Sequence, residues 1–232
     1  MRFIIHEMPY ERPLRAGIFR YEQDTQPTGA VEQWRLTAVA GGYRFLRVDL
    51  DARAAPSGQS TLYHLTMNEH GQPEQLKFRF WADGIEASGI LLCGDDALTL
   101  TRNVNGARHE EEIARDRVFW LPSSVGLGML ARAAQEGAHH LAAVTLDTRS
   151  LHSPAQAEAA FALRRADLTL CIGPEEELAV RRETHVVRPL LITWDDQQRT
   201  IWIDEHGWPL QMRRQDGLIA RETQYIRYPT AN

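Results

Sequence analysis

The sequence is poor in cysteine, since its 232 residues include only Cys93 and Cys171. These two residues are far apart and lie in apolar stretches. We expect two buried free thiols in a reducing cytosol, because cysteine behaves there as a small apolar residue. The sequence also allows a disulfide between them, although no spacing pattern favours it.

Long apolar runs are also missing. No stretch approaches the roughly 20 apolar residues that a transmembrane helix needs. Near the start, only Phe3–Ile5 form an apolar run, which is too short for the core of a secretory signal peptide. We therefore expect a cytoplasmic protein with no transmembrane segment, unless a leader has been trimmed from this sequence.

The chain has little excess charge of either sign. It carries 26 Lys and Arg against 31 Asp and Glu, for a net charge of −5. The pairs Arg164–Arg165, Arg181–Arg182 and Arg213–Arg214 are interspersed with acidic residues, which is typical of solvated strand faces. This balance gives no general attraction to nucleic acid or to anionic membranes, and we expect no nucleic-acid partner.

Alternating polar and apolar residues are present over most of the chain. Leu76, Phe78 and Phe80 alternate with Lys77 and Arg79, which is the pattern of a half-buried strand. The content of apolar residues, 43%, is sufficient for a core. The first predicted strands are 15–23, 30–38, 42–51, 59–68, 74–81, 85–93, 97–104 and 107–114. Those of the second half are 140–147, 166–173, 177–186, 189–195, 199–205, 208–214 and 218–227.

Short turn sequences separate these strands. Asn105–Gly106 is the strongest of them, because a type I′ turn requires positive φ at both central residues. Asp83–Gly84 and Asp216–Gly217 are similar signals. Strands joined by turns this short must be antiparallel, so the pattern predicts a long meander, an interruption and a second meander.

The interruption is an amphipathic stretch at 123–136. Leu127, Leu130, Ala131 and Ala134 follow helical spacing and share one face. Ser123 or Ser124 can cap its start, and Gly137 stands where a left-handed residue ends many helices. Gly126 and Gly128 weaken the first turns of the helix, which predicts a helix start that loosens as a lid; the alternative is that both glycines allow a close approach of the helix to the sheet. A short helical turn is also predicted at 153–162, with Ser153 as cap and Pro154 at its first position.

A meander of this length cannot remain flat, and must twist, curl or close. The single apolar helix face needs a partner, and the concave face of a curled sheet provides one. The predicted fold is therefore mainly β: one domain over 1–232, with a long antiparallel meander curled into a half-barrel around one central α-helix.

This element order resembles the bacterial lipoprotein-carrier (Lol-type) half-barrel and related uncharacterised bacterial half-barrel proteins. The resemblance rests on Leu121–Ser124 followed by Leu127 and Leu130, on the segment 199–210, and on Asp216–Glu222. It implies a sheet wrapped around an apolar cavity that holds a lipid or an acyl chain. It implies no catalytic residues.

A metal site and a catalytic site are both weakly indicated. His109–Glu112 and His139–His140 offer imidazole and carboxylate groups, but metal-binding spacings such as HExxH are absent. A charged strand edge explains 109–112 better, and we expect no metal and no other cofactor. No GxSxG motif surrounds Ser123 or Ser124, which the helix cap explains.

Polar residues on apolar strands suggest where a ligand binds. His64 and Arg102 each lie on an otherwise apolar strand, and a polar group on an inward face needs a partner from the protein or from a ligand. A structural hydrogen bond is the simpler explanation. Trp120, at the entrance of the helix, is the best candidate for the rim of a cavity.

We therefore expect a non-enzymatic binding protein that holds a lipid-like or apolar small molecule between the curved sheet and the helix. The predicted ligand-binding residues are Trp34, His64, Phe78, Phe80, Arg102, Trp120, Leu127 and Leu130. Two alternatives stay open. One is a small hydrolase or isomerase that uses a cavity His with an acid. The other is a structural or interaction domain with a filled core. The sequence does not predict the oligomeric state.

Overall fold

The computed structural model describes residues 7–135, 139–152, 154–181 and 183–229. It is mainly β, with 64% of the residues in strands. The strands of the first meander are β1 (Arg12–Gln23), β2 (Gln26–Ala38), β3 (Arg44–Ala52), β4 (Gln59–Met67), β5 (Pro73–Ala82), β6 (Ile85–Cys93), β7 (Ala97–Val104) and β8 (Ala107–Ala114). Alternating residues and tight turns fold this region as the sequence predicts.

The second half begins at the short strand β9 (Val118–Phe119). Its other strands are β10 (His140–Leu146), β11 (Leu163–Ile172), β12 (Glu176–Val180), β13 (Glu183–Trp194), β14 (Gln197–Ile203), β15 (Pro209–Arg214) and β16 (Ile219–Arg227). The 3-10 turns are η1 (Ala40–Gly42), η2 (Val125–Leu127), η3 (Arg149–His152) and η4 (Pro154–Ala159). The one α-helix among the described residues is α1 (Gly128–Gln135).

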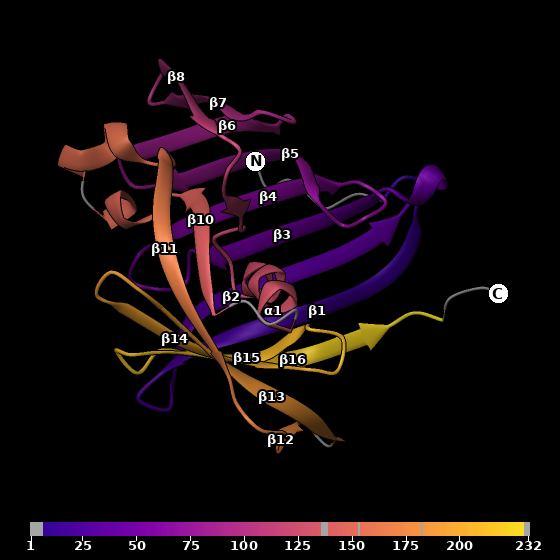
Figure 1. The fold of residues 1–232 in the computed structure, drawn as a ribbon. Helices are drawn as coiled ribbons and strands as arrows, with labels where there is room; N and C mark the ends of the chain where they lie inside the picture. Colours follow the sequence, from indigo (N-terminus) through magenta and orange to yellow (C-terminus); the bar gives the residue numbers. More distant parts are fainter. Residues whose placement is uncertain (1–6, 136–138, 153, 182, 230–232) are drawn as a thin grey trace.

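All strands belong to one large, curved and unclosed sheet. Its order is β8-β7-β6-β5-β4-β3-β2-β1-β16-β15-β14-β13-β11-β10-β9, and β12 pairs with β13 beside this path. The two meanders therefore meet where the first strand pairs with the last. The sheet curves so that β10 and β11 lie over the face of the first meander, and α1 lies inside this curve (Figure 1). This is the predicted half-barrel around one helix.

The core lies on the concave face of the sheet. One row that crosses five strands consists only of leucines, and their side chains are at most 2% exposed. This row is Leu46, Leu65, Leu76, Leu91 and Leu100. Because strand residues alternate between faces, the same strands direct their other side chains to the outer face. None of the described helices is both long and apolar enough to cross a membrane.

The helix is shorter than predicted, and it starts differently. Leu127, Leu130, Ala131 and Ala134 are buried in the core, as their spacing predicts. The stretch 125–127 is a 3-10 turn, however, and α1 begins only at Gly128. Residues 136–137, which include the predicted stop, lie outside the described residues.

A distant carboxylate explains this start. Glu32 of β2 accepts hydrogen bonds of 2.9 Å from the backbone N–H groups of Ser124 and Val125. Ser123 Oγ accepts the N–H of Gly126 at 3.0 Å, so Ser123 is the capping serine. The hydroxyl of Ser124 instead lies 2.7 Å from that of Tyr21. The helix start is thus fixed both by its own Ser123 and by Glu32 from the sheet.

Two strand predictions were wrong. The predicted strand 177–186 contains a turn, because Arg181 has φ 58 and the chain reverses there between β12 and β13. Strand β13 then continues through Pro189, which lies between the segments paired with β11 and β12, and whose carbonyl oxygen accepts the N–H of Gly173 at 2.7 Å. Strand β9 was not predicted, and it pairs with β10 in parallel.

One further expectation needs correction. Cys93 and Cys171 are both free, but only Cys93 is buried, because alternation along β11 directs Cys171 outward. The predicted short helical turn at 153–162 is confirmed as the 3-10 helix η4, which begins at Pro154, and η3 precedes it. Ser153, its predicted cap, lies outside the described residues.

Candidate ligand-binding groove

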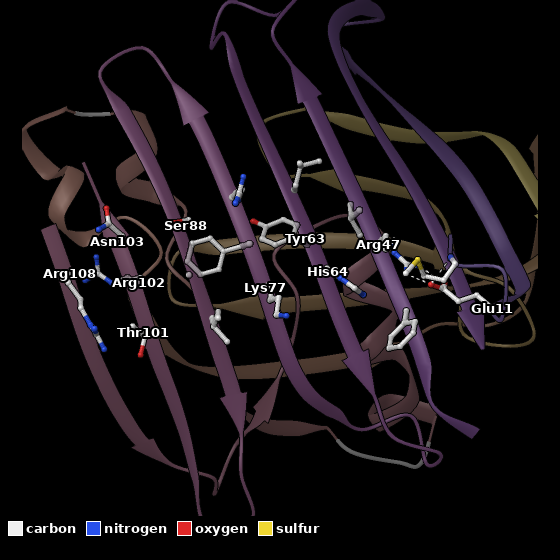
Figure 2. A pocket seen from close by; sticks show the side chains of 18 of the residues that line it. Glu11, Arg47, Tyr63, His64, Lys77, Ser88, Thr101, Arg102, Asn103 and Arg108 are labelled. Atoms are coloured by element: carbon white, nitrogen blue, oxygen red, sulfur yellow. Dashed lines mark hydrogen bonds and ion pairs between the residues drawn. The ribbon is translucent and has the colours of Figure 1, made fainter. Parts of the chain in front are cut away.

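A groove crosses the outer face of the first meander, from β3 to β8. Its volume is about 940 Å³. The groove runs across the strands rather than along them, because two neighbouring cross-strand rows of side chains form its walls (Figure 2). One row is Arg47, His64, Lys77, Ile90 and Thr101. The other is Leu62, Arg79, Ser88, Asn103 and Arg108.

The floor between these rows is formed by the residues that alternate with them along each strand and face the core. Val48, Tyr63, Phe78, Gly89 and Arg102 form one cross-strand row whose side chains point toward the core. They therefore present mainly their backbone to the groove. Gly89 is required here, since a Cβ atom would lie 2.6 Å from the ring of Phe78. The absence of a side chain at Gly89 thus leaves room for the ring of Phe78.

The segment before β1 forms the end of the groove nearest β3. Met8 and Tyr10 are 50% and 66% exposed and line it. Glu11 fixes this segment, because it accepts hydrogen bonds from both terminal nitrogens of Arg47 at 2.7 and 2.6 Å. The guanidinium and the neighbouring Thr37 hydroxyl outweigh burial and lower the pKa of Glu11 to about 2. The apolar rim at this end is thus held by a buried ion pair.

Cationic side chains predominate in the polar part of the groove. Glu11 is the one acidic residue in its described lining, and Arg47 neutralises it. The ammonium group of Lys77 makes no hydrogen bond or ion pair with any residue that the structure describes, and the side chain is exposed. Arg108, at the far end, pairs with Glu110 on the exposed edge of the sheet. A ligand in this groove would meet an apolar surface with positive charge beside it.

His64 lies between Arg47 and Lys77 in one wall of the groove. Its ring contacts Phe45 edge-on, with the ring centroids 5.4 Å apart. Burial, followed by the charges of Arg47 and Lys77, lowers its pKa to about 4, so the imidazole is neutral near pH 7. Its Nε2 atom is buried and has no hydrogen-bond partner in the described part of the chain.

The residues predicted to bind a ligand separate into two groups. His64 lies on the outer face, and Phe78 and Arg102 contribute to the floor of the groove. The others are at most 4% exposed and pack together in the core, and they are Trp34, Phe80, Trp120, Leu127 and Leu130. The prediction that His64 faces inward was wrong, because along β4 the buried residues are Tyr63 and Leu65, and alternation directs His64 to the outer face. Sequence alternation also did not reveal which face is hollowed.

Arg102 has the structural role that was the simpler explanation. Its Nε atom donates to Glu111 at 2.9 Å, and one terminal nitrogen donates to the carbonyl oxygens of Glu158 and Ala160. Trp120 is 4% exposed and packs edge-on against Trp194, with 6.1 Å between ring centroids, so it does not form an open rim.

Neither a metal centre nor a His–acid pair is visible at the predicted places. Within the described ranges, no three His, Cys, Asp or Glu side chains are close enough to hold a metal ion. His64 makes no ion pair with a described carboxylate, and both oxygens of Glu11, the acid in the groove, bond to Arg47. Among the described residues that line the groove, His64 and Glu11 therefore do not form a His–carboxylate pair.

The outer residues that complete the groove were missed at the level of sequence. Leu62, Ile90 and Tyr10 look like ordinary strand or loop residues. The exposure of Ile90, 42%, only becomes apparent when neighbouring strands are placed beside it. The available signal was a run of apolar residues on both faces of 89–92, which exceeds simple alternation.

Comparisons with known proteins give no relative for this chain. No protein-family model matches it, and no similar curated protein or solved structure was found. The site must therefore be interpreted from its own geometry.

Proposed function

We propose that this is a non-enzymatic binding protein for a lipid-like molecule with an acidic head group, and that the outer groove is its binding site. The observation that carries this proposal is the groove itself, with its volume of about 940 Å³. Small-molecule sites usually have volumes of about 300–1,000 Å³ and mostly apolar walls with a few polar groups.

The shape and the charge of the groove support an elongated anionic ligand. An acyl chain that lies across the strands contacts Phe45, Leu62 and Ile90 along its length. The stem of Lys77 adds apolar surface while its ammonium group stays in water, where it can pair with a carboxylate or a phosphate. The sequence placed such a ligand between sheet and helix. We place it on the outer face, because the side chains predicted to surround it pack against one another in the core.

The proposal can be tested with dodecanoate and two matched variants. Ile90 and Leu92 lie on the same face of β6 and are 42% and 48% exposed, but only Ile90 lines the groove. Ile90→Asp should weaken dodecanoate binding about tenfold or more, because it places a charge against the acyl chain. Leu92→Asp should bind like the original protein. Isothermal titration calorimetry measures both affinities.

The head group has its own control. Lys77→Gln should weaken dodecanoate binding but leave binding of uncharged dodecanol unchanged, since only the carboxylate pairs with the ammonium group. Absence of dodecanoate binding at concentrations below its micelle formation would overturn the proposal. Equal losses in Ile90→Asp and Leu92→Asp would do so as well, because binding would then not depend on the groove.

A further inference from the structure

A second cavity lies inside the half-barrel, between the sheet and the start of the helix. Its volume is about 280 Å³. Its walls come from the ends of β1–β4, from the segment 122–124, from Thr148 and Leu151, and from β14 and β15. It is separated from the outer groove by the sheet, and the two sites share only Tyr63.

Arg199 of β14 brings an unpaired cation to this cavity. Its guanidinium lies over the ring of Trp194, 5.1 Å from the centroid, and makes no hydrogen bond or ion pair within the described ranges. Its Nε atom is buried without a partner. Burial lowers the pKa of Arg199 to about 10, so it stays charged near pH 7. Arg199 as a whole is half-buried, but its buried Nε atom loses its contact with water and is costly unless an anion or an ordered water accepts its hydrogen bond.

Two further hydrogen-bond donors line the same cavity. Tyr63 and Thr61 of β4 are each 4% exposed, and both line the cavity. Each hydroxyl is a hydrogen-bond donor that a ligand in the cavity can use. Donors from β4 and β14 thus meet at one small cavity.

The buried carboxylate of Glu32 is already hydrogen-bonded to other groups. Glu32 accepts the Tyr21 hydroxyl at 2.7 Å and the two N–H groups at the helix start. No aspartate or glutamate belongs to the described lining, while Arg214 adds a second cation that pairs with Asp216 at the exposed end. The cavity therefore has an excess of donors and of positive charge.

We propose that this inner cavity binds a small oxyanion, a carboxylate or phosphate group on a molecule of few atoms, with Arg199, Tyr63 and Thr61 as its donors. The geometry suits this class because guanidinium and hydroxyl groups bind oxyanions through charge-assisted hydrogen bonds. The apolar residues Leu50, Ala52 and Met212 in the same walls accept the carbon atoms of a short organic acid.

The test measures binding of inorganic phosphate and of butyrate by isothermal titration calorimetry, with sodium chloride added to hold the ionic strength constant. At least one of the two anions should bind, and the stronger one identifies the head group. Arg199→Gln should weaken its binding about tenfold or more, because a charge-assisted contact is lost. Tyr63→Phe should weaken it about threefold to tenfold while it keeps the packing of the ring.

Arg213→Gln is the matched control. Arg213 lies on the neighbouring strand and also stacks on a tryptophan, 5.4 Å from the ring of Trp202, but it does not line the cavity. Its replacement should leave anion binding unchanged. If neither anion binds, or if Arg199→Gln and Tyr63→Phe both bind like the original protein, the proposal is wrong. Should Arg199→Gln fail to fold, Tyr63→Phe alone decides.

Discussion

Three buried carboxylates fix separate parts of the fold. Glu11 holds the segment before β1 to Arg47, Glu32 holds the helix start, and Glu222 of β16 binds to residues of β1 and β2. Glu222 accepts the indole N–H of Trp34 at 3.0 Å and the backbone N–H groups of Ile18 and Gln224. In each case, donors from the protein replace the water molecules that the carboxylate loses on burial, and this compensates for the cost of burying it.

Glu222 should make stability depend on pH. Burial raises its pKa from 4.5 to about 7, although its three donors act in the opposite direction. Because the folded protein binds this proton more tightly, the contribution is full below pH 4.5 and is lost as the pH rises to about 7. Glu222→Gln should remove this loss, which is about 2 to 3 kcal/mol in the free energy of unfolding.

Urea unfolding from pH 4.5 to 8 measures the effect as the difference between the two proteins. This difference is needed because His64, whose pKa is lowered to about 4, adds stability as the pH rises from 4 to 6.5. Curves that stay parallel over the whole range would show that Glu222 ionises at its ordinary pKa.

The prediction for Arg102 succeeded because the alternation of a strand indicates which side of the sheet a side chain faces. The sequence assigned Arg102 inward with a hydrogen-bonding partner, and the structure confirms both. It did not single out Glu32 or Glu222, although Glu32 shares a strand face with Trp34 and Leu36. The position of the charged Glu32 on an apolar strand face was a signal that the sequence contained. The sequence did not indicate its partners, because Ser124 and Val125 are 92 and 93 residues away in the chain.

At the scale of elements, the helix start depends on close contact. A Cβ atom at Gly126 would lie 2.1 Å from the carbonyl oxygen of Leu121, and one at Gly128 would lie 2.8 Å from Pro209. Neither glycine has positive φ, so space rather than backbone conformation requires them. The contacts favour the close-approach interpretation over a loosening lid.

Gly126→Ala should therefore destabilise the protein by about 2 to 3 kcal/mol, because the methyl group has no room and the helix start must shift. Gly94→Ala is the control, since Gly94 also lacks positive φ and its nearest contact, with Ala97 O, would be 3.3 Å. It should change stability by less than about 1 kcal/mol. Chemical denaturation compares the two, and similar effects would show that the Leu121 contact relaxes easily.

Elements with strong local signals were placed well. The predicted 85–93, 97–104 and 107–114 coincide with β6, β7 and β8. Their turns contain glycine or Asn–Gly, which specify backbone conformation locally. The reversal at Arg181 has no such signal, since its positive φ is imposed by the pairing of β12 with β13.

At the scale of the whole molecule, the pairing of β1 with β16 joins the two meanders. Trp34 of β2 also stacks on Trp208, which lies just before β15, with 5.2 Å between ring centroids. The helix and Phe161 then pack on the first meander from the second half, and Phe161 stacks on Phe78 at 4.6 Å. Neither half completes its core alone.

We expect a single cooperative unfolding transition for this reason. Far-UV circular dichroism, which follows all strands, and tryptophan fluorescence, which follows sites such as the Trp34–Trp208 stack, should give the same midpoint in urea. Two separate midpoints would show that the meanders unfold independently and that the β1–β16 pairing contributes little.

Local sequence patterns are enough to predict the class of the fold, because alternation, tight turns and helical spacing act over a few residues. They predict a long antiparallel meander, one helix with Leu127, Leu130 and Ala134 inward, and a curled sheet around that helix. The positions of the two cavities depend on the packing of the whole chain. Packing filled the space around Trp120 and Phe80, whereas the curvature of the sheet left open the outer face beside Ile90 and the cavity at Arg199. Cavities are lined by residues that are distant in the chain, so local sequence patterns do not predict them.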